Sequence, residues 1–160
     1  MYKIAEELVT LCQKRSLTIA TAESLTGGLI GSCITSIPGS SQIYLGGIIS
    51  YTNEAKAELL SVSVESLNSD GAVSERVARE MATGAREALC ADYAVAVTGI
   101  AGPGGEEPDK PVGTVYIALA SPRELTCKRH LFSGTRDEVR CSTACEALEA
   151  IIKAINTDLE

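Results

Sequence analysis

One short segment limits the folds open to this chain more than any other part of the sequence. Residues 93–97 form a continuous apolar run, which is typical of a central strand in a sheet that is covered on both faces. The run leads directly into residues 98–105, where five of eight positions are glycine or proline and no regular element can continue. These two segments predict a buried strand that ends in a loop able to approach a ligand closely.

Helical and strand patterns alternate along the rest of the sequence. Helices are expected over residues 2–15, 29–36, 53–60, 74–90 and 137–156, and strands over 17–21, 43–51, 93–97, 113–121 and 125–132. Asn53 and Ser74 are the expected N-caps of two helices, and Gly46-Gly47 indicates a bulge or a close backbone approach. A turn at 123–124 joins the last two strands as a hairpin. We therefore predict one domain, residues 1–160, with a three-layer α/β/α sandwich and a mixed, mostly five-stranded sheet.

The charge balance argues against a nucleic-acid partner. The chain has 21 Asp and Glu against 14 Lys and Arg, a net charge of −7, and no basic cluster longer than Lys128-Arg129. Proteins that bind nucleic acid normally carry a basic face that replaces counterions at the phosphates. A local positive pocket for one small anion remains compatible with this composition.

No segment of the sequence has the pattern of a secretion signal or a membrane span. Residues 1–15 are charged and helical in period, unlike the apolar core of a signal peptide. The longest uncharged stretch, residues 24–53, is rich in Gly, Ser and Thr, which is unlike a membrane helix. We expect a soluble, cytoplasmic protein without a membrane partner.

The cysteines and the single histidine narrow the chemistry. We expect the six cysteines to be reduced thiols, and we interpret Cys141 and Cys145 as small buried helix residues rather than metal ligands. A Ser-His-Asp triad would have to use His130, which the pattern places as a partly exposed residue at a strand end. Hydrolytic chemistry in this chain would therefore need a base other than histidine, and no metal is expected.

Two polar segments follow the first two predicted strands. In residues 21–28, Ser24 could be a nucleophile at a strand-to-helix turn, or it could merely cap the helix. In residues 51–56, Lys56 could be a desolvated base at a pocket mouth, or an ordinary solvated helix lysine. The turn at residues 38–41 contains two hydroxyls, and turn chemistry alone explains them.

Two further segments could contact a ligand. The Gly-rich loop 98–105 resembles a phosphate cradle but lacks the Lys-Ser/Thr pair of a Walker A loop. Arg136, near the start of the last helix, could bind a carboxylate or phosphate through two hydrogen bonds, or it could be a surface arginine.

Seven stretches in register resemble the CinA C-terminal domain family, the nicotinamide-nucleotide amidohydrolases. These stretches are TAESLTGG (21–28), PGSS (38–41), YTNEAK (51–56), GAVS (71–74), TGIAGPGG (98–105), KPVGTVY (110–116) and FSGTRDEVR (132–140). One departure is Leu25, where the family usually has cysteine after the motif serine. The chain is similar to the stand-alone form of the family, because Met1 lies just before the first predicted helix.

The resemblance implies an activity and a set of site residues. The enzyme would convert nicotinamide mononucleotide and water to nicotinate mononucleotide and ammonia, with no cofactor, and a homodimer would be expected. Ser24 would be the nucleophile, Lys56 the general base, and Ser41 and Tyr51 would support proton transfer and orientation, with Ser41 as the reserve nucleophile. The substrate would contact Thr26, Gly27, Gly28, Thr98, Gly99, Gly102 and Arg136.

In the mechanism that follows from these roles, backbone N–H groups near Gly27-Gly28 would stabilise the oxyanion, and the phosphate would lie against the Gly-rich loop or Arg136. Three alternatives stay open at this point. The first is a catalytically silent module that binds or senses pyridine nucleotides. The second is a role in DNA uptake or repair, which the acidic charge opposes. The third is hydrolysis of a different amide or phosphoester on a similar nucleotide.

Overall fold

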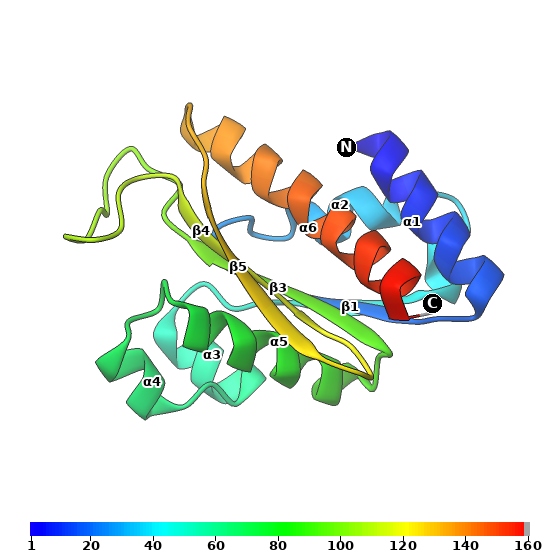
Figure 1. The fold of residues 1–160 in the computed structure, drawn as a ribbon, viewed down its shortest axis with the longest axis horizontal. Helices are drawn as coiled ribbons and strands as arrows, with labels where there is room; N and C mark the ends of the chain where they lie inside the picture. Colours follow the sequence, from blue (N-terminus) through cyan, green and yellow to red (C-terminus); the bar gives the residue numbers. More distant parts are fainter. Residues whose placement is uncertain (159–160) are drawn as a thin grey trace.

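A computed structural model describes residues 1–158 of the chain (Figure 1). Its elements are α1 (Tyr2–Arg15), β1 (Ile19–Glu23), α2 (Leu29–Thr35), the 3-10 helix η1 (Ser40–Gln42), β2 (Tyr44–Ile49), α3 (Asn53–Leu60), α4 (Val64–Ser69), α5 (Glu75–Leu89), β3 (Tyr93–Gly99), β4 (Thr114–Ala120), β5 (Leu125–Leu131) and α6 (Arg136–Asp158). The strands form one mixed sheet in the order β2-β1-β3-β4-β5. The predicted mixed five-stranded α/β/α sandwich is confirmed.

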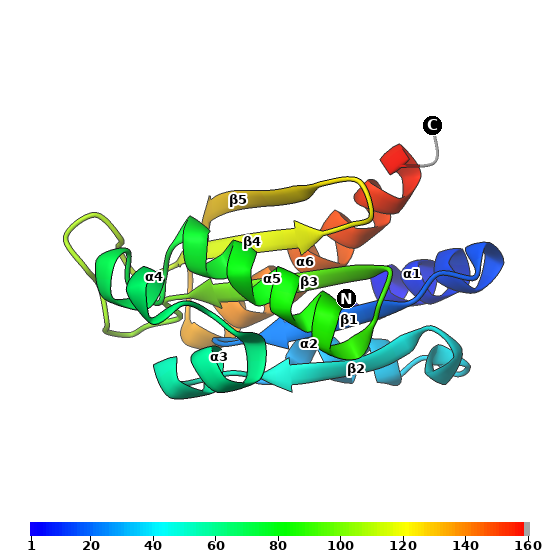
Figure 2. The same ribbon diagram turned by 90° about the horizontal axis from the view of Figure 1, so that it is seen from below.

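The sheet lies between two layers of helices. Helices α1, α2 and α6 cover one face, and α3, α4 and α5 lie on the other (Figure 1). Strands β2, β1 and β3 run parallel, whereas β4 and β5 are antiparallel to their neighbours, with β5 at one edge and β2 at the other (Figure 2). The carboxyl ends of three adjacent strands therefore meet on one side of the sheet, where open α/β folds build their ligand sites.

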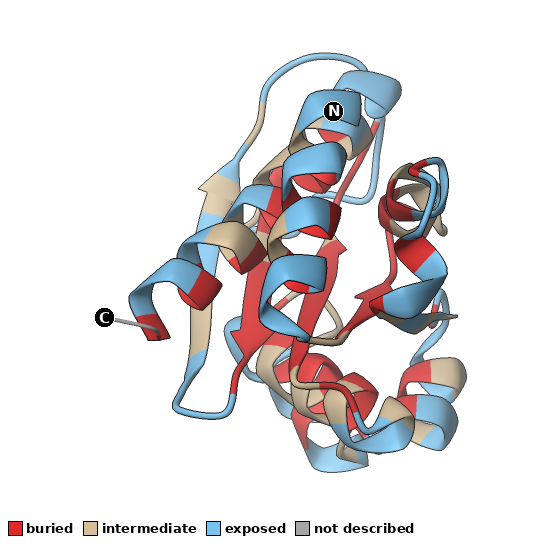
Figure 3. Cartoon of the chain, turned by 90° about the vertical axis from the view of Figure 1, so that its right-hand side faces the viewer, coloured by how far each residue is buried: buried red, intermediate tan, exposed pale blue. Residues whose placement is uncertain are grey.

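The core is built from small and branched aliphatic side chains. Every residue of β1 is buried, as are the first six of β3, because helices cover both faces of these strands (Figure 3). On the face covered by α5, most of the buried side chains are alanines, so the helix packs closely on the sheet. Helix α5 also lies close to α3, because a Cβ at Gly84 of α5 would clash with the carbonyl oxygen of Leu60 in α3. The apolar run at 93–97 thus occupies the central position that its composition predicts.

Three local details differ from the sequence-based expectations. Strand β1 begins two residues later than predicted and extends through Glu23, whose carboxylate is buried but fully paired. Thr52, not Asn53, caps α3, because its side-chain oxygen accepts a hydrogen bond from the Ala55 N–H. Helix α4 is absent from the prediction, since its six residues are too short and polar to show a helical period.

Strand β2 contains the irregularity that its two glycines indicate. The pairing register with β1 shifts between Ile19 and Ala20, so that Leu45 is the extra residue, and Gly46 has a φ of 149°. A Cβ at Gly47 would clash with the hydroxyls of Thr21 and Tyr44. A bulge and a close side-chain approach therefore both occur, as the sequence predicts for a strand glycine pair.

Candidate active site

A small cavity of about 200 Å³ lies at the carboxyl ends of β1, β2 and β3. Its lining residues come from five segments that are distant in the sequence: Ser24, Leu25, Tyr51, Lys56, Ala72, Val73, Thr98, Gly99, Ala101 and Arg136. The topology brings these segments together because each one directly follows or precedes an element that reaches this edge of the sheet. Six of these residues are candidates from the sequence.

Ser24 and Lys56 form the chemical centre of the cavity. The Lys56 Nζ lies 3.1 Å from the Ser24 Oγ and 2.8 Å from the Ser50 carbonyl oxygen, to which it donates. Ser24 is only 8% exposed and Lys56 only 2% exposed, so bulk water has little access to the pair. Lys56 is therefore a buried lysine and not a solvated helix lysine, and Ser24 lies beside its amine.

Burial lowers the pKa of Lys56 to about 8, because the charged ammonium loses its hydration inside the protein. Among residues 1–158, no carboxylate forms a salt bridge with its Nζ, so no opposite charge restores the ordinary value. A substantial share of the amine is thus neutral near physiological pH. The Ser50 carbonyl accepts one N–H of this amine and so holds the Nζ beside the Ser24 Oγ, to which the amine also donates.

The turn that carries Ser24 is held by a buried carboxylate. Glu23 accepts hydrogen bonds from the N–H groups of Gly28, Ile30 and Gly31, at 2.9, 3.1 and 2.8 Å. These are donors at the start of α2, which the helix itself leaves unpaired. Glu23 is 1% exposed, and the three bonds offset the cost of burying its charge. Because Glu23 directly precedes Ser24, its carboxylate holds the start of α2 in a fixed position relative to the turn that carries Ser24.

A second group holds the same turn from the far end of the chain. Arg140 on α6 donates to the carbonyl oxygens of Leu25 and Thr26, at 3.1 and 3.0 Å. Sequence reasoning singled out neither Glu23 nor Arg140 as site residues, although both lie within quoted family stretches. The available signals were that Glu23 directly precedes Ser24 and that Arg140 lies one helical turn after Arg136. Nothing in the local sequence shows that these two side chains reach the turn.

Tyr51 and Arg136 form an outer wall of the cavity. Arg136 donates to the Gly102 carbonyl oxygen at 2.8 Å and to the Tyr51 hydroxyl at 3.1 Å. The guanidinium is thus oriented by the Gly-rich loop and by the end of β2, and it faces the cavity. It is the cationic group best placed to meet an anionic part of a ligand.

Thr98 and Gly99 form the floor at the end of β3. The Thr98 hydroxyl donates to the Ala72 carbonyl oxygen at 2.7 Å, which fixes the GAVS turn against the strand. Gly99 is in close contact with β4, where a Cβ would lie 2.7 Å from the Thr114 carbonyl oxygen. This glycine is therefore needed for strand packing as well as for access to the cavity.

The glycine turn before α2 does not face the cavity. The Gly27 N–H donates to the Ser24 carbonyl and the Gly28 N–H to Glu23, so the expectation that these amides hold an oxyanion needs correction. Leu25, the residue that follows Ser24, lines the cavity, and its N–H makes no backbone hydrogen bond among residues 1–158. Thr26 is buried outside the cavity lining, and Gly102 contributes only the carbonyl that orients Arg136.

Ser41 does not reach this cavity within one chain. It lies in η1, before the start of β2, whereas Ser24 follows the end of β1. The two strands are parallel, with Ile19 opposite Tyr44 and Glu23 opposite Ile49. Ser41 and Ser24 therefore lie at opposite ends of the strands, and a supporting role for Ser41 in the same chain is wrong on geometric grounds.

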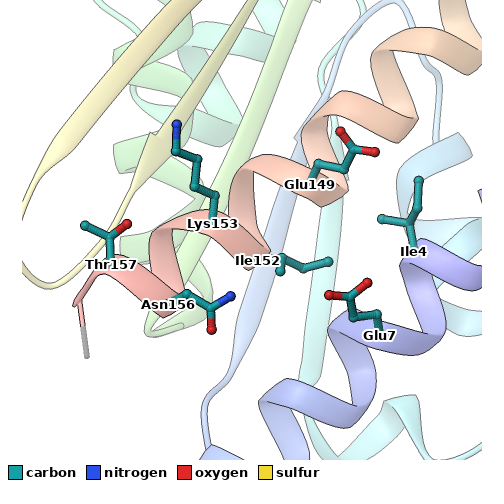
Figure 4. Close-up of a pocket in the computed structure, with 7 residues that line it drawn as sticks. All are labelled: Ile4, Glu7, Glu149, Ile152, Lys153, Asn156 and Thr157. Atoms are coloured by element: carbon teal, nitrogen blue, oxygen red, sulfur yellow. The ribbon is translucent and has the colours of Figure 1, made fainter. Parts of the chain in front are cut away.

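Among residues 1–158, no other serine or threonine hydroxyl is hydrogen-bonded to a lysine amine. A hollow between α1 and α6 is lined by Ile4, Glu7, Glu149, Ile152, Lys153, Asn156 and Thr157, and has no nucleophile beside a base (Figure 4). His130 is a half-buried residue of β5, in agreement with the partly exposed strand position expected from the sequence, and its ring stacks on Phe132. Within residues 1–158, no three His, Cys, Asp or Glu side chains are grouped to ligate a metal, and no helix could span a membrane.

Comparison with known proteins gives consistent similarity over nearly the whole chain. Residues 1–155 match the CinA C-terminal domain family. A CinA-like protein of Citrifermentans bemidjiense is 49% identical over 144 residues, and one of Geobacter sulfurreducens is 49% identical over 147, which is 90% and 92% of this chain. The matched parts are 35% and 36% of those proteins, so this chain spans about a third of their length.

Solved structures show the same fold. The competence/damage inducible protein CihA of Agrobacterium tumefaciens superposes with a TM-score of 0.94 at 41% identity, covering 97% of this chain and 94% of that one. A CinA superfamily protein of Klebsiella pneumoniae gives a TM-score of 0.94 at 29% identity, covering 98% of both chains. The arrangement of strands and helices around the cavity is therefore shared with experimentally determined proteins.

Proposed function

This chain belongs to the CinA C-terminal domain family, and we propose that it is a Ser/Lys amidohydrolase that acts on nicotinamide mononucleotide. The products are nicotinate mononucleotide and ammonia. The observation that carries the proposal is the 3.1 Å separation of the Ser24 Oγ and the Lys56 Nζ, both buried at a cavity. A lysine whose pKa burial lowers to about 8 can serve as the base that histidine provides in other serine hydrolases.

The first half-reaction forms an acyl-enzyme. Neutral Lys56 takes the proton of the Ser24 hydroxyl as Oγ forms a bond to the carboxamide carbon, and the carbonyl electron pair moves to oxygen. The positive pyridinium ring withdraws electrons from this carbonyl and makes it more electrophilic than an ordinary amide. The tetrahedral intermediate then breaks its C–N bond, and the Lys56 ammonium returns the proton to the leaving nitrogen, which departs as ammonia.

The second half-reaction releases the acid. Water loses a proton to Lys56 as its oxygen attacks the acyl carbon, and the bond to Ser24 Oγ breaks on collapse of the second intermediate. The serine oxygen regains the proton, and the amine is neutral again. We assign the oxyanion of both intermediates to the Leu25 N–H, because Leu25 lines the cavity directly after Ser24, and one good donor contributes about 2.7–4 kcal/mol.

The remaining lining groups fit the non-reacting part of the nucleotide. Arg136 can pair with the phosphate through charge-assisted hydrogen bonds. Thr98 and Gly99 offer polar backbone beside it. The chemistry proposed here uses the side chains of Ser24 and Lys56 and requires no cofactor.

The solved relative from Agrobacterium tumefaciens is named a competence/damage inducible protein. For this chain we propose a small-molecule substrate instead of DNA. Its net charge is −7 and its longest Lys/Arg run is two residues, which is unlike the basic charge of proteins that bind nucleic acid.

An ammonia-release assay with nicotinamide mononucleotide tests the proposal. Ser24→Ala and Lys56→Met should each reduce turnover to background while circular dichroism shows a folded protein. The matched control is Lys14→Met, at an exposed position in the last turn of α1, which should retain full turnover. Binding of the mononucleotide without ammonia release by the unmodified protein would instead favour a silent nucleotide-binding module.

A further inference from the structure

Ser50 is a fully buried residue whose backbone and side chain differ in their hydrogen bonding. Its N–H donates to the Glu23 carbonyl oxygen at 2.9 Å, and its carbonyl oxygen accepts the Lys56 Nζ at 2.8 Å. Its hydroxyl, in contrast, has no hydrogen-bond partner among residues 1–158. A buried hydroxyl without a partner costs stability, so its presence beside the candidate base points to a function.

The Ser50 side chain points to the face of the sheet that α3 covers. Side chains alternate between the two faces along an extended segment. Ile49, which precedes Ser50, points toward α2, since a Cβ at Gly28 would lie 3.1 Å from its Cδ1. Tyr51, which follows Ser50, bonds to Arg136 of α6 on the same face as α2. Ser50 therefore points the other way, toward the helix that carries the candidate base.

Ser50 and Ser24 are also neighbours at the ends of two parallel strands. Strand β1 pairs with β2 so that Glu23 lies opposite Ile49, and each of these two residues is followed by a serine. The bond from the Ser50 N–H to the Glu23 carbonyl continues this pairing beyond β2, and adjacent strands lie about 4.8 Å apart. The Ser50 hydroxyl, the candidate nucleophile and the Lys56 amine therefore lie in one small region.

A charged Lys56 would have more donors than the resting site has acceptors for it. An ammonium group carries three N–H donors. Among residues 1–158, its Nζ donates to two acceptors, the Ser24 Oγ and the Ser50 carbonyl oxygen. Once Lys56 has taken the Ser24 proton and the Oγ has bonded to the acyl carbon, that oxygen is a poorer acceptor. The charge thus forms in the interior just when its acceptors are fewest, where an unpaired N–H is costly.

We propose that the Ser50 hydroxyl accepts a hydrogen bond from the Lys56 ammonium while the Ser24 Oγ is bonded to the acyl carbon. Rotation about χ1 moves the Ser50 Oγ between staggered positions, and the carbonyl of the same residue already holds the Nζ at 2.8 Å. Ser50 is not among the residues that line the cavity, so it acts through Lys56 and is a positioning residue for the base. The inference rests on the proposed function, in which Lys56 receives the Ser24 proton.

This role gives Ser50→Ala opposite effects on activity and on stability. Loss of an acceptor for a charged donor should lower kcat for ammonia release about 10- to 100-fold, with KM nearly unchanged. Loss of a buried hydroxyl that bonds to nothing in the described chain should leave the urea midpoint the same or raise it. Ser50→Thr keeps the hydroxyl and should retain most of the turnover. A Ser50→Ala protein with normal kcat, or one whose kcat falls only together with its urea midpoint, would overturn the proposal.

Thr114→Val is the matched control. Thr114, the first residue of β4, is fully buried, and its hydroxyl likewise has no partner within residues 1–158. It does not line the cavity. Its replacement should shift the urea midpoint in the same direction as Ser50→Ala and leave kcat unchanged. Equal losses of turnover in the two variants would show a general packing effect and would overturn a specific role for Ser50.

A covalent probe tests Ser50 without the mononucleotide. When an alkyl phosphonofluoridate reacts with Ser24, the Oγ bonds to phosphorus, fluoride leaves with its bonding electrons, and the serine proton stays on Lys56. The labelled protein therefore holds the charged amine beside an esterified Oγ, which is the state in which Ser50 acts. Intact-mass spectrometry should show labelling of Ser50→Ala about 10- to 100-fold more slowly than labelling of the unmodified protein, with Ser24→Ala as the background.

The probe and the ammonia assay separate the two proposals. Equal labelling rates for Ser50→Ala and the unmodified protein would overturn the role of Ser50, even where the unmodified protein releases ammonia. Slow labelling of Ser50→Ala by a chain that releases no ammonia would support the role of Ser50 and contradict only the proposed substrate. Thr114→Val should be labelled at the rate of the unmodified protein.

Discussion

Arg140 donates from its Nε to the carbonyl oxygen of Leu25, 3.1 Å away, and so ties the residue after the candidate nucleophile to helix α6. A second bond from the same guanidinium to Thr26 makes the contact bidentate. The two segments are more than a hundred positions apart in the sequence, so only the tertiary fold creates this contact. Because the Leu25 N–H is the expected oxyanion donor, Arg140 acts as a positioning residue for that donor.

Replacement of Arg140 by methionine should therefore lower kcat by about 10- to 100-fold, with a smaller change in KM. The reason is that both bonds hold the two peptide groups that directly follow the Leu25 N–H, and so fix the position of that donor, whereas neither bond touches the ground-state substrate. Steady-state ammonia release measures the two constants. The control Arg15→Met removes an exposed arginine of α1 and should leave both unchanged. An increase in KM alone would assign Arg140 to substrate binding.

Glu23→Gln should destabilise the protein and reduce turnover together. A glutamine NH₂ in place of Oε2 would face the N–H groups of Gly28 and Ile30, so a charge-assisted acceptor is lost and two donors are opposed. We expect a loss of about 2–3 kcal/mol in the free energy of unfolding, measured by urea denaturation. Glu87→Gln, at an exposed position of α5, is the control and should change stability little. Unchanged stability in Glu23→Gln would show that these bonds do not hold the turn.

The pH dependence of kcat/KM should follow the ionisation of Lys56. The base must be neutral to accept the Ser24 proton, so activity should rise about tenfold per pH unit on the acidic side and level off above about pH 8. The measurement covers pH 5.5 to 9.5 in buffers of constant ionic strength. A profile that is flat across this range, or that falls as pH rises through 8, would be incompatible with a lysine base.

Much of this architecture could be predicted from local patterns, because helices and strands of this size show their periodicity in the sequence. The amphipathic stripe of α5 and the apolar run of β3 specify both elements and their burial. The strand predicted at residues 17–21 ends before the observed end of β1, because Glu23 is a charged residue that the sequence pattern places outside a buried strand. In the fold its carboxylate is buried against the backbone N–H groups of α2. Such a pairing depends on a tertiary contact that composition does not encode.

The site was predictable to the extent that its residues follow strand ends. Ser24, Thr98 and Tyr51 lie next to the carboxyl ends of β1, β3 and β2, and the parallel topology brings them together. Side-chain direction could not be predicted in the same way. The N–H groups of Gly27 and Gly28 bond within the turn, and Ser41 lies at the other end of β2, because its strand runs parallel to β1.

Arg136→Met should weaken binding of the mononucleotide and leave the chemical step nearly intact. Its guanidinium faces the cavity and is already oriented by Gly102 and Tyr51, so it meets a phosphate without a large ordering cost. We expect KM for nicotinamide mononucleotide to rise about 10- to 100-fold. Nicotinamide riboside, which lacks the phosphate, serves as the matched substrate and should show little change. Equal losses for both substrates would place the phosphate elsewhere, against the Gly-rich loop.

Replacement of Lys56 by methionine should abolish turnover and yet stabilise the fold. The side chain is 2% exposed and its pKa is lowered to about 8 by loss of hydration, so the folded state at neutral pH holds a charge that water would hold better. Methionine fills a similar volume without that charge, and we expect a gain of about 1–3 kcal/mol in the free energy of unfolding at pH 7.

The stability gain from the Lys56→Met substitution should become smaller as pH rises. Between about pH 8 and the ordinary lysine pKa of 10.5, the unfolded chain binds more protons at this residue than the folded chain, so the unmodified protein gains stability relative to the variant as pH rises. Urea denaturation at pH 7 and pH 10 measures the difference in the free energy of unfolding between the variant and the unmodified protein. The other ionisable groups are the same in both proteins, so their effects cancel in this difference. A difference that stays constant or grows with pH would show that the Lys56 amine is not held in a desolvated state, and the base assigned to the reaction would have to be sought elsewhere.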